Sequence, residues 1–122
     1  MNTLNQINET KVAHIAHSFL TDAYFFLEKV LVFRSHDPNK RTSLIAKLAV
    51  DLLMSSECSL KAAYASSQSA PAEELMVKIK REFKHDIRKT LSYIDDSPLE
   101  IEEKDFLEKM SDEGVGLRYS LD

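Results

Sequence analysis

The chain has few of the residues that end helices or form covalent cross-links. Its 122 residues include one cysteine, two glycines and three prolines. The single cysteine, Cys58, excludes an intrachain disulfide, so the sequence is unlike that of a disulfide-stapled secreted domain and we expect a cytoplasmic protein. Pro38, Pro71 and Pro98 fall at regular intervals, as helix boundaries would.

Long apolar runs and a strong charge of one sign are also lacking. No apolar stretch approaches the roughly 20 residues of a membrane-spanning helix, and the first ten residues do not resemble a secretory signal, so we expect no membrane association. The formal net charge is −4, from 16 Lys and Arg against 20 Asp and Glu. This balance argues against a surface that is basic all round, and any contact with nucleic acid would need a local basic patch.

Hydrophobic residues make up 43% of the sequence, which is enough for one sizeable core, and we expect residues 1–122 to form a single domain. From 8 to 33, and again from 44 to 63, apolar residues recur every three or four positions, as in amphipathic helices. Asn8 is suitably placed to cap the first helix. Because only a short polar turn joins the two segments, they are expected to form a long antiparallel hairpin.

A polar loop then separates the hairpin from a third helical pattern. Ser69 is predicted to cap this helix and Pro71 to begin it. The apolar stripe runs through 72–94, which is either one helix or two helices with a break near Lys84 and His85.

The C-terminal part of the chain carries one more helix signal. A capping-box sequence at 97–100 predicts a short last helix that ends before Gly114, followed by irregular residues from 115 to 122. No strand-like alternation longer than a few residues occurs. The sequence therefore predicts an all-α fold, a four- or five-helix up-and-down bundle built on the long antiparallel hairpin.

Three features of this pattern follow one another in a particular order. The second helix is rich in alanine and acidic residues, a histidine and an aspartate open a later helix, and an arginine and a tyrosine follow a short last helix. The alanine-rich and acidic part of the second helix comprises 49–53, Glu57 and 60–62. The histidine and aspartate lie within 84–87, and the arginine and tyrosine lie within 117–119. In this order the chain resembles the HEPN family of small helical proteins. The resemblance implies a domain that dimerises through its long helices and, in many members, a metal-independent ribonuclease site made of an arginine and a histidine.

The resemblance assigns the catalytic roles to His85, Arg81 and Lys80. Histidine can take a proton from a ribose 2′-hydroxyl or give one to a leaving oxygen, and a guanidinium stabilises charge that develops on the phosphate. The family separates the two residues by four to six positions, whereas three residues separate Arg81 from His85 and four separate Lys80 from it. Lysine lacks the planar fork of arginine, so Lys80 is the poorer substitute. On a continuous helix, Arg81 and His85 would share a face.

Basic residues gather between 78 and 89 and form the best candidate surface for contacting phosphate. The candidate substrate-binding residues are Lys84, Asp86, Arg88, Glu57 and Lys61. Each also has an ordinary structural explanation. Charged runs are commonly the solvated face of a helix, Asp86 is suited to cap a helix start, and Glu57 and Lys61 have the spacing of a helical ion pair. Glu57 has a further possible role, which is to orient a neighbouring basic residue.

The remaining functional patterns are weaker. His14 and His17 have a spacing that metal ligands use, but no third and fourth ligand is suggested, and there is no glycine-rich phosphate loop, so we predict neither a metal nor a cofactor. Tyr24, Phe25 and Phe26 place aromatic rings on neighbouring faces of the first helix. These rings cover a wider part of the helix than a single stripe facing the core requires. The additional aromatic face is a candidate dimer surface.

Two hypotheses on function therefore stay open. The first is a HEPN-like homodimer that binds RNA or a nucleotide at the Lys80, Arg81 and His85 region, with weak metal-independent endoribonuclease activity. The second is a non-catalytic helical module that binds a protein partner, for example as a component of a toxin-antitoxin or defence system. A fold alone does not decide between them.

Overall fold

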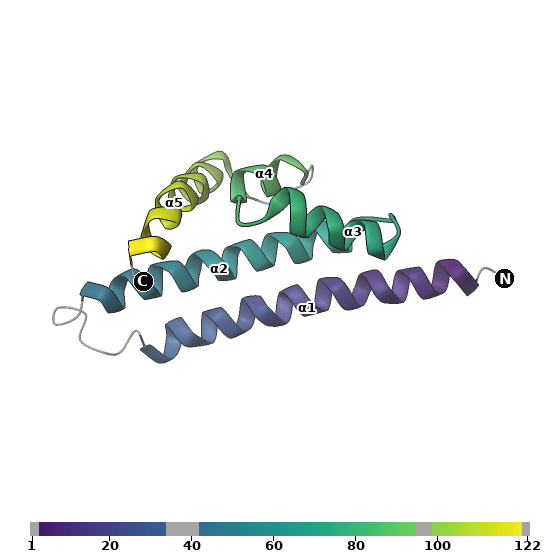
Figure 1. Ribbon diagram of the computed structural model, residues 1–122, viewed down its shortest axis with the longest axis horizontal. Coiled ribbons are helices and arrows are strands. Elements are labelled where there is room, and N and C mark those ends of the chain that lie inside the picture. Colours follow the sequence, from purple (N-terminus) through teal and green to yellow (C-terminus); the bar gives the residue numbers. More distant parts are fainter. Residues whose placement is uncertain (1–2, 34–41, 95–98, 121–122) are drawn as a thin grey trace.

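A computed structural model describes residues 3–33, 42–94 and 99–120 of the chain (Figure 1). These residues contain helices and short connections and no β-strand. In chain order the elements are α1 Thr3–Phe33, α2 Thr42–Ser66, α3 Ala72–Lys78, the π-helical turn η2 Ile79–Phe83, α4 Ile87–Ser92 and α5 Ile101–Ser120. The all-α prediction is thereby confirmed for the part of the chain that is described.

The two longest helices, α1 and α2, lie antiparallel and side by side, as the hairpin prediction requires (Figure 1). With 31 and 25 residues they measure about 46 Å and about 37 Å at a rise of about 1.5 Å per residue. Their facing surfaces bury mainly apolar side chains, and the Ser55 hydroxyl of α2 donates a hydrogen bond to the Ala23 carbonyl of α1 at 2.8 Å. Among the described residues, no helix is long and apolar enough to cross a membrane.

The first helix begins at Thr3, five residues before the predicted cap Asn8, so the prediction that Asn8 caps this helix is wrong. Asn8 instead caps α3: its Oδ1 accepts a hydrogen bond from the Ala72 N–H at 2.8 Å, and its Nδ2 donates to the Ala70 carbonyl at 3.0 Å. Ser69 is consequently not the cap of α3, which begins after Pro71. The amide thus ties the start of α1 to the loop that follows α2.

The helical pattern between 72 and 94 is interrupted at the place where a break was considered. The helix α3 continues directly into η2, and the chain then turns at Lys84 before α4 begins. Two separate apolar clusters explain this break, since Phe83 packs in one of them and Ile87 in the other. The first cluster consists of Val12, Tyr64, Ala65, Ala72, Leu75, Ile79 and Phe83, and the second consists of Leu53, Ile87 and Leu91.

The last helix, α5, runs from Ile101 to Ser120, so the predictions of a short helix ending before Gly114 and of an irregular tail are wrong. Each glycine costs a helix about 1 kcal/mol relative to alanine, which packing can offset. The helix α5 packs on α2 and α4, with Leu107 and Met110 against the second cluster. Glu103 accepts a hydrogen bond from the Glu100 N–H at 3.1 Å at its start. Residues 97 and 98 of the predicted capping box lie outside the described residues. The arginine and the tyrosine at 118 and 119, expected to follow the last helix, fall within α5.

Candidate functional site

A buried carboxylate and an exposed imidazole meet where α2 passes the break between η2 and α4. Glu57 of α2 is 2% exposed, whereas the side chain of His85 is 60% exposed. The Oε2 atom of Glu57 lies 3.0 Å from Nδ1 of His85. A carboxylate oxygen accepts hydrogen bonds, so Nδ1 is the donor in this contact. The other ring nitrogen, Nε2, makes no hydrogen bond with a described residue.

Lys61 reaches the same break from the next turn of α2. Its side chain is buried, with 9% of the residue exposed, and its Nζ donates a hydrogen bond to the main-chain carbonyl of Lys84. The ring of Phe19 lies 6.0 Å from the ammonium. A buried ammonium needs hydrogen-bond acceptors to offset its desolvation, and the Lys84 carbonyl is one of them. Glu57 and Lys61 therefore both contact the segment after η2, and the basic residue that Glu57 contacts is His85.

The break itself has an unusual backbone. Lys84 has φ 45° and ψ −118°, a conformation that glycine adopts easily and a residue with a Cβ does not. Its N–H donates to the Ile79 carbonyl at 3.2 Å, and the Asp86 N–H donates to the Phe83 carbonyl at 2.8 Å. Because the helix ends at Phe83, the condition under which Arg81 and His85 would share one helix face is not met.

Lys80 and Arg81 are exposed on η2 and form no hydrogen bond or ion pair with the described residues. Arg81 borders a shallow surface hollow with Val77 and Lys78, rimmed by the carboxylates of Glu73, Glu74 and Glu82. No contact joins Arg81 or Lys80 to His85 in the described part of the chain. Both cations are nevertheless on the segment that leads directly to His85.

Asp86 and Arg88 have the ordinary structural roles that were weighed for charged residues here. Asp86 caps α4, since its Oδ1 accepts a hydrogen bond from the Lys89 N–H at 3.0 Å. Arg88 forms ion pairs with Glu108 at 3.1 Å and Asp112 at 3.0 Å, which fasten α4 to α5. The guanidinium of Arg88 is thus already matched to two carboxylates, whereas the exposed side chain of Lys84 is not held in this way.

Cys58 neighbours Glu57 on α2 and is 7% exposed. Burial raises the pKa of its thiol, against the opposing effect of the nearby Lys61 ammonium. The thiol therefore stays protonated at neutral pH, as expected of a structural cysteine. Within the described ranges, no group of three or more His, Cys, Asp or Glu side chains is arranged to hold a metal ion.

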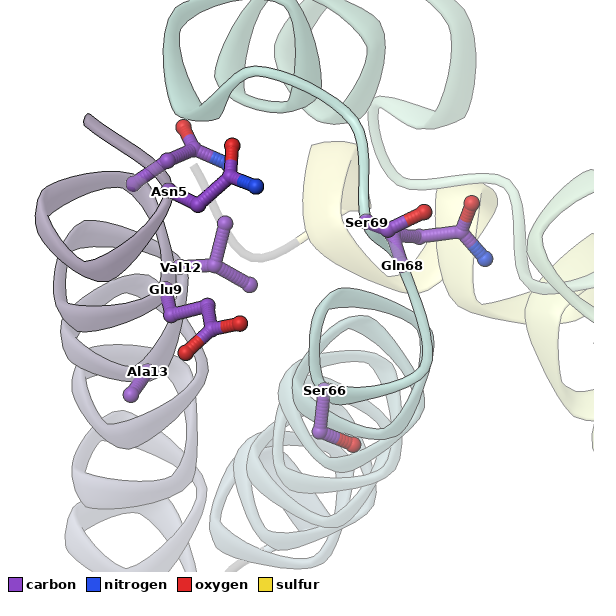
Figure 2. Close-up of a pocket in the computed structure, with 8 residues that line it drawn as sticks. Asn5, Glu9, Val12, Ala13, Ser66, Gln68 and Ser69 are labelled. Atoms are coloured by element: carbon purple, nitrogen blue, oxygen red, sulfur yellow. The ribbon is translucent and has the colours of Figure 1, made fainter. Parts of the chain in front are cut away.

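A polar hollow of about 480 Å³ lies at the end of the hairpin where α1 begins and α2 ends, between the start of α1 and the loop after α2 (Figure 2). Figure 2 shows the Glu9 carboxylate directed from α1 toward α2 across this hollow. Its other lining residues are Asn5, Asn8, Val12, Ala13, Ser66, Gln68 and Ser69. Sequence reasoning did not predict this hollow, because its walls are 60 residues apart in the chain and only the polar loop gave a signal. It shares no residue with the Glu57 and His85 pair.

No family model, no curated protein and no solved structure matches this chain. The assignment of function consequently depends on the geometry of the site and on the chemistry of its residues.

Proposed function

We propose that the chain is a HEPN-like RNA-binding domain, a single up-and-down helical bundle, in which His85 and Glu57 form the centre of a metal-independent endoribonuclease site. The observation that carries the proposal is an exposed imidazole held at 3.0 Å by a carboxylate that is 2% exposed. A buried acidic partner fixes the tautomer and the direction of a histidine that exchanges protons. A purely solvated helix face would not need such a partner.

The reaction that suits this pair is transesterification at a ribose. Nε2 of His85 takes the proton of the 2′-hydroxyl, and the 2′-oxygen attacks the adjacent phosphorus. The bond from phosphorus to the 5′-oxygen breaks, and that oxygen takes a proton from water or from the second imidazole of a dimer. The products are a 2′,3′-cyclic phosphate and a 5′-hydroxyl. Glu57 stabilises the imidazolium that forms after the first proton transfer.

Three cations are available for the substrate phosphates. Lys80, Arg81 and Lys84 are exposed and immediately precede His85 in the chain. Each phosphate contact would release a counterion, so the affinity for RNA should fall as the salt concentration rises. Arg88 ranks below these residues because two carboxylates already bind it.

The homodimer in this proposal is supported by the surface of α1. Its C-terminal half exposes five large apolar residues: Leu20 42%, Tyr24 62%, Phe25 58%, Leu31 47% and Val32 62%. Phe26 is partly buried, and its ring lies 5.9 Å from that of Phe25. Large apolar side chains exposed in such number on one half of a helix are typical of a protein contact. Light scattering after gel filtration should give a dimer, and Phe25→Glu should give a monomer.

The function is tested by cleavage of a mixed RNA pool in EDTA. His85→Ala should lower the rate by a factor of about 10² to 10⁴, the usual contribution of a general base. Glu57→Gln should lower it by about 10 to 100 because the ring loses its orienting partner. The matched control is His14→Ala, which removes an exposed histidine of α1. Cleavage that is equal in the wild type and His85→Ala, or no cleavage by either, would refute the ribonuclease site at His85.

The second candidate is a helical module that binds a protein partner without catalysis. It is favoured by the absence of any contact between Arg81 and His85 among the described residues and by the ion pairs that engage Arg88. This module would bind no RNA at 50 mM salt, and Lys80→Ala with Arg81→Ala would leave its partner binding unchanged. RNA binding that weakens in this double variant excludes the module as the sole function.

A further inference from the structure

The residue that precedes His85 is held in a conformation it would not choose alone. Lys84, at φ 45°, is the single non-glycine residue with positive φ in the described part of the chain. A backbone of this kind persists only where the surroundings impose it, and such residues are concentrated at functional sites. The preceding turn is π-helical, which is also a feature that is frequent at functional sites.

The helix α2 holds this turn at two points. Lys61 donates a hydrogen bond to the Lys84 carbonyl, and Glu57, one turn earlier on α2, accepts from Nδ1 of the His85 ring at 3.0 Å. The first contact fixes the peptide that links Lys84 to His85. The direction of this peptide determines where the Cα and the side chain of His85 begin.

We propose that Lys61 is a positioning residue for His85 and acts through the strained backbone of Lys84. Without the ammonium, the Lys84 carbonyl loses its buried donor and the residue relaxes to negative φ. The next peptide then rotates, and the imidazole moves away from Glu57. The role of His85 in catalysis rests on the proposed function, but the positioning itself is a property of the fold.

A different role for Lys61 makes the opposite prediction. If Lys61 only neutralises the buried charge of Glu57, its removal increases the negative potential at that carboxylate, and the contact with His85 becomes stronger. Removal of Lys61 should therefore weaken the contact between His85 and Glu57 if Lys61 is a positioning residue, and strengthen it if Lys61 only neutralises charge. Only the positioning role predicts that the residue at position 84 influences this contact.

The experiment is NMR of protein with ¹⁵N-labelled histidine, in which the ring shifts identify the protonated nitrogen. In the wild type, His85 should carry its proton on Nδ1, protected from exchange by Glu57. In Lys61→Met this signature should be lost, and in Lys61→Arg, which keeps a donor, it should be retained. Lys47→Met removes an exposed lysine of the same helix and is the control, with no change expected.

Glycine at position 84 separates strain from charge. Because glycine adopts positive φ without strain, the double variant Lys61→Met with Lys84→Gly should recover the Nδ1 signature. Retention of the signature in Lys61→Met alone would overturn the proposal, as would its absence in the double variant. If Lys61→Met unfolds, the double variant should still fold, and a double variant that is also unfolded contradicts the positioning role.

The outcome is independent of RNA. A loss and recovery of the signature in a protein that cleaves no RNA would leave the positioning of His85 intact and would refute the ribonuclease. Cleavage that disappears in His85→Ala but is unchanged in Lys61→Met would support the ribonuclease and refute the positioning role of Lys61.

Discussion

Replacing Lys84 with glycine should stabilise the protein, because the strain lies in the folded state and glycine removes it. A residue with a Cβ in a sparsely populated backbone region costs about 1 to 3 kcal/mol, taken here as about 2. Glycine makes the unfolded chain more flexible, which costs about 0.5 to 1 kcal/mol. The side chain of Lys84 is exposed, so little packing is lost. The net gain in the free energy of unfolding is about 1 kcal/mol.

Urea denaturation followed by circular dichroism measures this gain as a higher midpoint with an unchanged slope. With an unfolding entropy of about 2.1 cal/mol/K per residue, 1 kcal/mol corresponds to a rise in Tm of about 4 °C for this chain. Lys80→Gly is the matched control, since it places glycine at an exposed position inside η2, where it should cost about 1 kcal/mol. Equal destabilisation by both substitutions would refute the argument that Lys84 is strained.

Three other predictions concern stability. Asn8→Ala removes the side-chain amide of α1 that caps α3, and should lower the free energy of unfolding by about 1 to 2 kcal/mol, measured by urea denaturation. The control Gln6→Ala, on the exposed surface of α1, should have little effect. Arg88→Ala breaks two exposed ion pairs, and its cost of about 0 to 1 kcal/mol should shrink in 1 M salt; a cost that salt leaves unchanged would contradict an electrostatic origin. Because burial raises the pKa of the Cys58 thiol, the folded state holds this proton more tightly than the unfolded state. This contribution is complete below the unfolded pKa of about 8.5 and is lost as the pH rises past it, so the drop in stability above that pH should be smaller in Cys58→Ala.

The parts of the fold that repeat locally could be predicted from sequence. The spacing of apolar residues in α1 and α2 predicted the hairpin, and the change of direction near Lys84 was recognised as a candidate break. Contacts between distant residues could not be predicted in the same way. Asn8 is a common helix cap, but nothing local indicates that the helix it caps begins 64 residues later, at Ala72.

The end of the last helix shows a second limit of local reasoning. Gly114 and Gly116 are typical of a helix terminus, yet α5 continues through both. Ahead of the glycines this helix packs on the rest of the fold, with Leu107 and Met110 against the second cluster and Ser111 buried. Glycine penalties of about 1 kcal/mol each are small compared with the burial of several apolar side chains, so tertiary contacts override propensity.

The site shows the same contrast. His85 was chosen from the resemblance and Glu57 only as one of several alternatives, because the two residues are 28 positions apart and no spacing rule joins them. Arg81 and Lys80 were assigned by their sequence spacing from His85, which the resemblance supplied. Because of the break at Lys84 they do not share a continuous helix with His85, although both residues remain exposed on the preceding turn.

Three departures from the rules of a stable core coincide at this turn. Glu57 and Lys61 place ionisable groups in the interior, where well-packed apolar residues are often equally or more stabilising. Lys84 occupies a backbone region that a glycine would fill at lower cost. All three costs surround one exposed imidazole. The residues that line the polar hollow near Glu9 include no buried ionisable group and no strained backbone. This difference is the physical reason for proposing His85, and not the hollow, as the centre of the function.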